Sequence, residues 1–233
     1  MQGKGMSRAA VVLALGVLPA TAFAGVASAT TQPQPTKLSI RASETAVRPH
    51  TKDTISGVLR SNGTRLAGQR VELEQRQAGT KKWTVEASGT TGAKGRVAFT
   101  VTPTHRREQY ELVFSGTAAY AASHSAVVTV TVKNGTSLSI SAAHDTVKPH
   151  EADTITGSLK SNGIGLRDMT VTLRDRKKGT SKWSEVRSAT TGANGHVRFS
   201  VVPASSDEQY KLTFAGTSRY FASHSGVVTV RVA

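Results

Sequence analysis

Apolar and polar residues alternate with a period of two along most of the chain. The clearest runs of apolar residues are Leu38, Ile40 and Ala42; Val97, Phe99 and Val101; Tyr110, Leu112 and Phe114; and Val128, Val130 and Val132. Serine, threonine, arginine and glutamate fill most of the positions between them. This alternation predicts β-strands with one buried and one solvated face, which is typical of antiparallel sheets.

Seven such strands are predicted in the first half of the chain. They lie near Leu38–Val47, Thr54–Ser61, Arg70–Gln77, Trp83–Gly89, Arg96–Thr102, Gln109–Gly116 and Ala126–Val132. Asn62-Gly63 and Asn194-Gly195 are signals for type I′ hairpin turns, and Lys94-Gly95 occupies the position equivalent to Asn194-Gly195. No segment shows sustained helical spacing. Short strands separated by frequent turns predict a β-sandwich.

The whole pattern returns at a shift of 100 positions without a gap. Pro49-His50 returns as Pro149-His150, and Trp83 returns as Trp183. About half of the positions from Thr36 to Lys133 are identical to their partners, as in a tandem array. We therefore predict an all-β protein with two β-sandwich domains, over residues 36–133 and 136–233.

The first residues are predicted to be an export signal. Lys4 and Arg8 precede an apolar run, and Ala27-Ser28-Ala29 fits a cleavage site, so residues 1–29 form the predicted signal peptide. A membrane anchor is the alternative, but Pro19 and small residues interrupt a run that is short for a span. Residues 30–35 are predicted to be a flexible leader. The protein is then predicted to be secreted, and either released or held loosely at the cell wall by non-covalent contacts. Without cysteine it has no disulfides.

Three segments of each repeat resemble bacterial immunoglobulin-like domains that occur in tandem in secreted and surface proteins. In the first repeat they are Ser61-Asn62-Gly63 through Val71-Glu72-Leu73, Trp83 through Phe99, and Tyr110 through Ser125. The resemblance implies an immunoglobulin-like sandwich of about seven strands for each repeat. It also implies roles in spacing, adhesion or binding of carbohydrates and surfaces, without shared catalytic residues. Thr117 and Thr217 stand where many members carry aspartate, which disfavours a calcium site there.

The chain is strongly basic, with 30 Lys and Arg against 15 Asp and Glu, a net charge of +15. This charge favours polyanions such as anionic cell-wall polymer, acidic polysaccharide or anionic lipid. The candidate polyanion-binding residues flank a Gly-Thr turn in each repeat: Arg76, Lys81 and Lys82, and Arg174, Arg176, Lys177, Lys178 and Lys182. Only 5% of residues are aromatic, which disfavours a stacking platform for specific nucleic-acid binding. The alternative is that the charge serves solubility alone.

Trp83 and Trp183 are candidates for stacking on carbohydrate, because each follows a basic turn. The alternative is a tryptophan that packs against the core or edge of its own sandwich.

The polar residues do not form a recognisable catalytic or metal-binding motif. The chain has seven histidines but no His-x-x-x-His pair, and it has no G-x-S-x-G motif. A scattered Ser-His-Asp group using His50 and Asp53 is the remaining enzymatic alternative. We predict no catalytic residue, no cofactor and no metal. The predicted function is that of a secreted, non-enzymatic module that binds anionic cell-surface or extracellular polymer through basic loops. The alternative is a structural or protein-binding spacer with no polyanion role.

Overall fold

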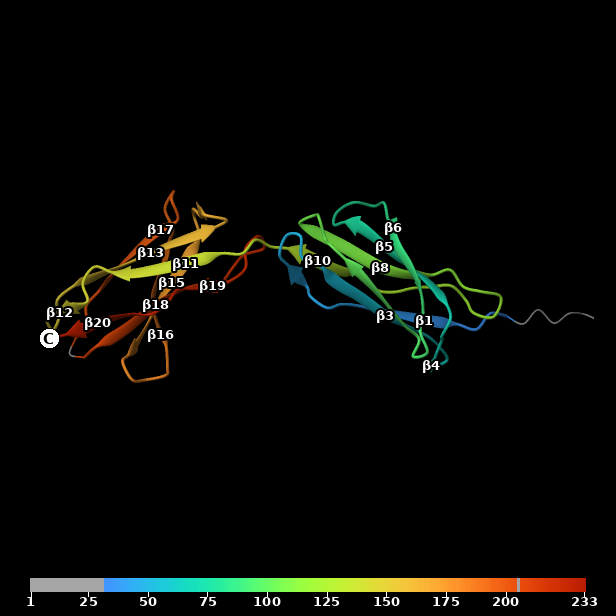
Figure 1. The fold of residues 1–233 in the computed structure, drawn as a ribbon, viewed down its shortest axis with the longest axis horizontal. Coiled ribbons are helices and arrows are strands. Elements are labelled where there is room, and N and C mark those ends of the chain that lie inside the picture. The colour runs from blue at the N-terminus through green and yellow to red at the C-terminus, as the bar shows by residue number, and fades with distance from the viewer. Residues whose placement is uncertain (1–31, 205) are drawn as a thin grey trace, which may run out of the picture. The chain divides into compact units, whose positions relative to one another are not determined.

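The computed structural model describes residues 32–204 and 206–233. The predicted export signal over residues 1–29 lies outside this range. The described residues form strands and loops without a helix, so no helix there is long and apolar enough to cross a membrane. Each repeat forms two sheets that face each other across one apolar core (Figure 1).

In the first repeat, one sheet is built around β3 (Asp53–Ser61), which pairs in antiparallel fashion with its three neighbours. These are β1 (Thr36–Ala42), β4 (Thr64–Arg65) and β7 (Arg96–Val101). The facing sheet has the order β2-β10-β8-β5-β6, and β9 also pairs with β8. Its strands are β2 (Ala46–Val47), β5 (Arg70–Gln77), β6 (Thr84–Thr90), β8 (Arg107–Phe114), β9 (Ser123–His124) and β10 (Val128–Val132).

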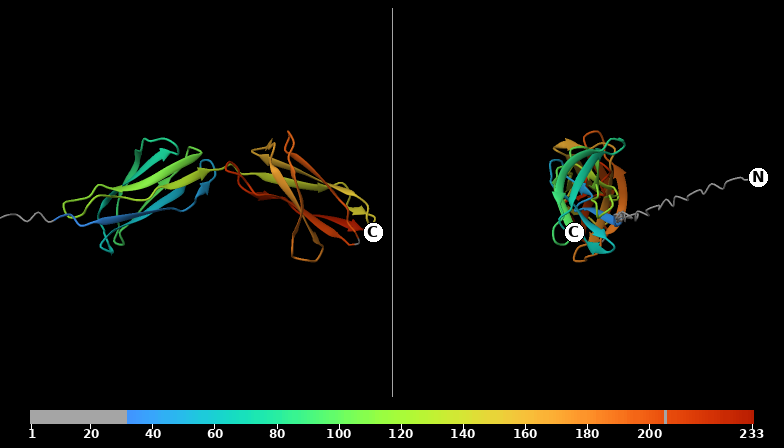
Figure 2. Two further views of the ribbon diagram at one scale, coloured as in Figure 1. Left: turned by 180° about the vertical axis from the view of Figure 1, so that it is seen from behind. Right: turned by 90° about the vertical axis from the view of Figure 1, so that its right-hand side faces the viewer.

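The second repeat has the same strand order as the first. Its strands are coloured from yellow to red in Figure 2. Its first sheet contains β11 (Ser137–Ala142), β13 (Asp153–Ser161), β14 (Ile164–Gly165) and β17 (His196–Val201). Its second sheet contains β12 (Thr146–Val147), β15 (Thr170–Lys177), β16 (Ser184–Thr190), β18 (Glu208–Phe214), β19 (Ser223–His224) and β20 (Val228–Val232). The predicted all-β class, with two tandem immunoglobulin-like sandwiches, is confirmed.

The core of each sandwich consists of the alternating apolar residues. Ile55, Leu59, Leu73 and Leu112 have no exposed surface, and Tyr110 is 1% exposed. The equivalent residues of the second repeat form a separate core cluster. The alternation therefore predicted the inward faces correctly, because successive side chains of a strand point to opposite faces of its sheet.

The first predicted strand, Leu38–Val47, is wrong as a single element. It divides into β1, which pairs with β3, and β2, which pairs in parallel with β10 in the opposite sheet. The buried carboxylate of Asp53 holds the bend, because it accepts hydrogen bonds from the Ser43 hydroxyl and from the Glu44 amide at 3.1 Å. In the second repeat His144 Nδ1 lies 3.0 Å from the equivalent Asp153 carboxylate.

The predicted type I′ hairpin turn is confirmed at Asn62-Gly63 and wrong at Asn194-Gly195. Asn62 and Gly63 both have positive φ, 47° and 82°, in the two-residue turn between β3 and β4. In contrast, only Gly195 of the Asn194-Gly195 pair has positive φ, and Gly95 of Lys94-Gly95 behaves in the same way. These turns join strands of opposite sheets, so they are not hairpins.

The expected flexible leader is partly ordered where the structure describes it. Gln34 forms an isolated parallel bridge with Tyr120, in which the Gln34 amide donates to the Ala119 carbonyl at 2.9 Å. Asn134 forms the equivalent bridge with Tyr220 in the second repeat. In each sandwich, a residue just before the first long strand therefore pairs with the loop that contains Tyr120 or Tyr220.

Candidate binding surface

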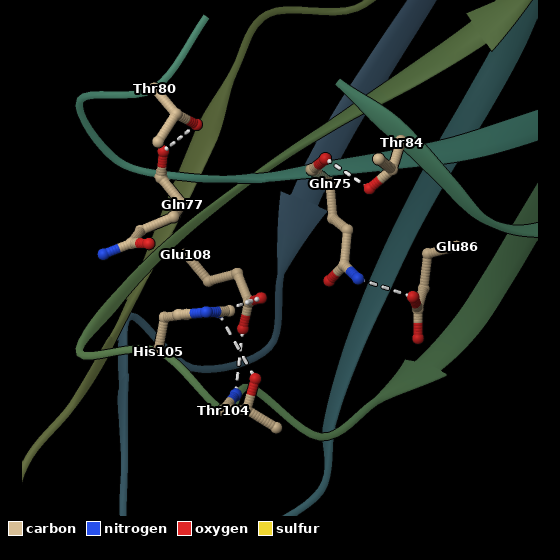
Figure 3. A network of polar contacts seen from close by, with 8 residues as sticks. All are labelled: Gln75, Gln77, Thr80, Thr84, Glu86, Thr104, His105 and Glu108. Carbon is tan, nitrogen blue, oxygen red and sulfur yellow. Dashed lines mark hydrogen bonds and ion pairs between the residues drawn. The ribbon is translucent and has the colours of Figure 1, made fainter. Parts of the chain in front are cut away.

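The predicted basic clusters lie on the β5–β6 hairpin and the equivalent β15–β16 hairpin. The Thr80 hydroxyl donates to the Gln77 carbonyl at 2.8 Å and closes the first turn (Figure 3). Thr180 makes the same bond to Lys177 in the second repeat. Gly79 and Gly179 have φ of 94° and 87°, a backbone conformation that favours glycine. The turn chemistry thus presents the neighbouring lysines at the tip of each hairpin.

Two arginines of the predicted set, Arg76 and Arg176, contact side chains of their own sandwich. Arg76 donates from Nε to the Gln109 side chain at 2.8 Å, and its guanidinium lies 4.2 Å from the centroid of the Trp83 ring. Arg176 repeats both contacts with Gln209 at 2.8 Å and with Trp183 at 4.5 Å. Such cation–π contacts stabilise the position of both side chains. The two arginines therefore have structural partners that the sequence pattern did not reveal.

Two further predicted cations lie in ion pairs. Lys178 Nζ is 3.1 Å from the Asp207 carboxylate, and Arg174 Nη2 is 3.8 Å from Glu185. The hydrogen bond from Lys178, with one from the Val232 amide, lowers the pKa of Asp207 below its ordinary value. The remaining members of the predicted set are exposed and form no ion pair within the described residues: Lys81, Lys82, Lys177 and Lys182.

Both tryptophans are half-buried on the outer side of their sheets, each with a cation over its ring. In the second repeat Lys211 Nζ also lies over Trp183, 4.3 Å from the centroid. The pattern of basic turns did not single out Lys211. Comparison of the two repeats contained a signal for it, because Glu111 occupies the equivalent position.

Removing the stacked arginine is expected to expose the indole. In a Trp183→Phe background, Arg76→Ala should red-shift the Trp83 fluorescence and increase its quenching by acrylamide. The first sandwich should lose about 0.5–1 kcal/mol of unfolding free energy, the value of an exposed cation–π contact. Arg96→Ala, an exposed arginine on the opposite sheet, is the control. Identical spectra for the two variants would contradict the stacked arrangement.

A buried acidic group lies at one end of the first sandwich. Glu108 is 3% exposed. It accepts a hydrogen bond from the Thr104 amide at 3.0 Å and lies 3.2 Å from His105 Nδ1 (Figure 3). Desolvation and then the Glu108 charge raise the pKa of Tyr110 above its ordinary value, and Tyr210 donates to Glu208 at 2.5 Å. In each repeat the tyrosine hydroxyl is therefore a hydrogen-bond donor to the glutamate two residues earlier in the chain.

The histidines are dispersed over the two sandwiches. His50 and His150 occupy the turn after proline with φ of 60° and 62°. Asp153 approaches His144 and not His150, and Asp53 accepts hydrogen bonds from its neighbours Ser43 and Thr54. Among residues 32–204 and 206–233, no group of three or more potential metal-ligating side chains occurs.

The strand order and the two cores define a tandem immunoglobulin-like β-sandwich protein. No known family model matches the chain, and no curated protein sequence matches it significantly. The two domains D0–D1 of intimin are 14% identical, with a TM-score of 0.33, 84% of this chain covered and 98% of that one. The adhesin InvE of Yersinia pseudotuberculosis is 15% identical, with a TM-score of 0.33, 84% of this chain covered and 59% of that one.

Red sea bream transglutaminase is 13% identical, with a TM-score of 0.41. The matched region covers 84% of this chain and 31% of the transglutaminase, so the chain spans less than a third of that enzyme. Similarities this low establish no shared function. The sandwich assignment rests on the strand pairing described above.

Proposed function

We propose that this protein is an extracellular, non-enzymatic module that associates with anionic cell-surface or extracellular polymer through the basic β5–β6 and β15–β16 hairpins. The observation that supports the proposal is the exposure of Lys81, Lys82, Lys177 and Lys182 at equivalent hairpin tips, without an ion pair in the described part of the chain. The net charge of +15 adds a long-range attraction to any polyanion.

The expected mode of binding is electrostatic and weakly specific. Lysine presents a compact charge on a flexible stem, which suits attraction to a charged polymer better than recognition of one fixed geometry. Neutralising polymer charges releases counterions, so the affinity should fall steeply as salt is added. The same dependence distinguishes this binding from burial of an apolar surface.

Charge reversal tests the proposal. The variant Lys177→Glu, Lys178→Glu, Lys182→Glu should be retained less on purified cell walls than the parent protein. Parent retention should require the anionic polymer of the wall and should decrease from low to high salt. The matched control reverses three exposed cations elsewhere in the second sandwich, Lys148, Lys160 and Arg198, and changes the net charge equally. Equal retention of both variants and the parent would contradict a role for the hairpin.

A structural or protein-binding spacer is the second candidate. It is favoured by the internal engagement of half of the eight predicted cations: Arg76, Arg174, Arg176 and Lys178. In that case wall retention is indifferent to the polymer and to salt. A protein partner that remains bound at high salt would support this candidate.

A further inference from the structure

The outer face of the second sandwich contains a groove that the first sandwich lacks in this form. The groove has a volume of about 690 Å³ and lies along β15 and β18. Met169 contributes apolar surface to it, and Arg174 and Lys211 supply cations. Its hydroxyl-bearing residues include Thr170, Thr172 and Thr213. A volume of this size is within the usual range of small-ligand sites.

The equivalent hollow of the first sandwich has a volume of about 310 Å³. There Arg70 and Glu72, whose side chains are 3.0 Å apart in an ion pair, replace Thr170 and Thr172. The long paired side chains occupy space that the threonines leave open. The two repeats share a backbone plan, so the groove results from side-chain replacements at a few positions.

The replacements also reverse the charge of this face. Arg174 on β15 lies directly opposite Lys211 on β18, whereas the equivalent residues Glu74 and Glu111 face each other in the first repeat. Like charges directly opposite each other across a β-pair are destabilising. Glu185 approaches Arg174 at 3.8 Å, whereas Lys211 lies over the Trp183 ring and makes no ion pair within residues 32–204 and 206–233. An anion between the two cations would relieve the repulsion.

We propose that this groove binds a segment of acidic saccharide, a hydroxyl-rich chain that carries carboxylate or phosphate groups. The proposal rests on the polyanion role proposed above and gives it a specific site. The oxyanion would lie between Arg174 and Lys211. The threonine hydroxyls and the Glu185 carboxylate would exchange hydrogen bonds with the hydroxyl groups of the chain.

A second copy of the protein is a less suitable occupant, although the Glu74–Glu111 face has the complementary charge. Two copies of a chain with a net charge of +15 repel each other. A flat sheet face would also leave the hollow unfilled, whereas its volume of about 690 Å³ is in the range of sites for small ligands such as a short saccharide segment. Self-association is therefore an outcome that the experiment must be able to detect.

The test compares a groove variant with the hairpin variant. Arg174→Glu, Lys211→Glu introduces the residues that the first repeat carries at these positions, so this sandwich type is known to accommodate them. Calorimetry would use three probes: an oligogalacturonate for carboxylate, a glycerol-phosphate oligomer for phosphate, and a neutral dextran oligomer. The groove variant should bind the anionic probes about tenfold more weakly or worse, since each exposed ion pair contributes only modestly. The anionic probe that binds with the higher affinity shows whether the groove prefers carboxylate or phosphate.

A gain of binding provides the complementary test. Arg70→Thr, Glu72→Thr, Glu74→Arg, Glu111→Lys transfers the groove residues to the first sandwich. The number of anionic oligomers bound per chain should rise by one relative to the parent protein. Stoichiometry is insensitive to a general change in attraction, so it reports the site itself.

Four results would overturn the proposal that the groove binds an acidic saccharide. They are no binding of either anionic probe, equal affinity for neutral dextran, unchanged affinity of the groove variant, and salt-sensitive dimerisation of the free protein that the groove variant abolishes. If the hairpin variant alone loses wall retention while the groove variant keeps its affinity, the proposed function stands without the groove. If both variants bind and are retained like the parent, both proposals fail.

Discussion

Adding one methyl group at Gly57 should strongly destabilise the first sandwich. Gly57 lies in the middle of β3 and faces the core, where a Cβ atom would overlap Leu112 Cδ1 and the Ser39 carbonyl oxygen. The backbone of β1 cannot move away without breaking its pairing with β3. We expect Gly57→Ala to lower the free energy of unfolding by about 3 kcal/mol, at the upper end of the usual cost of overpacking.

The measurement is urea unfolding followed by Trp83 fluorescence in a Trp183→Phe background. Gly92→Ala is the control, because its Cβ would lie 3.9 Å from the nearest atom considered, the Arg96 carbonyl oxygen. Leu112→Ala should partly offset the effect of Gly57→Ala, so the two changes should be non-additive. A Gly57→Ala variant as stable as Gly92→Ala would show that β1 and β8 pack less closely around this glycine. Gly157 should respond in the same way, because a Cβ atom added there would lie 2.9 Å from the Ser139 carbonyl oxygen.

The protein should lose stability steeply above about pH 10 because of two buried tyrosines. Desolvation, with the neighbouring glutamate charge and hydrogen bond, raises the pKa of Tyr110 and of Tyr210. In the unfolded chain tyrosine titrates near its ordinary value of about 10. Above that pH the unfolded state releases protons that the folded state retains. Stability is therefore complete below the unfolded pKa and falls as pH rises, by about 1.4 kcal/mol per pH unit for each tyrosine.

Unfolding free energies from pH 8 to pH 12 would measure this effect. Tyr110→Phe and Tyr210→Phe should each flatten the alkaline slope, although each also costs about 1–3 kcal/mol at neutral pH by removing a hydrogen-bond donor from Glu108 or Glu208. Tyr120→Phe, at a half-buried position outside this network, is the control and should leave the slope unchanged. An unchanged slope in the Tyr110→Phe, Tyr210→Phe double variant would rule out the proposed proton linkage.

The alternation of apolar residues was sufficient to predict the fold. It located the long strands of the first repeat and identified their inward faces, including Tyr110, Leu112 and Phe114, but it merged β1 with β2 and missed the short strands β4 and β9. The gap-free repetition extended the same result to the second sandwich. Sequence was also sufficient for the Asn62-Gly63 turn, because that dipeptide is one of the few that readily adopt positive φ at both positions.

Local pattern does not determine which distant segments pair. The division of Leu38–Val47 between two sheets depends on the buried Asp53 carboxylate and on the position of β10, far along the chain. The hairpin prediction at Asn194-Gly195 was wrong because the two neighbouring strands belong to opposite sheets. Core packing decides to which sheet each strand belongs. The turn dipeptide itself carries no information on that choice.

The candidate sites show the same division. Composition and clustering determined that cations gather around two equivalent turns. Only the tertiary structure showed that Arg76 and Arg176 stack on tryptophans, that Lys178 pairs with Asp207, and that Lys211 joins Arg174 in a groove. The side chains of arginine and lysine are long and flexible, so each can reach several possible partners. The partner of each is therefore fixed by cross-strand register, which brings together residues far apart in the chain and cannot be derived from their local order.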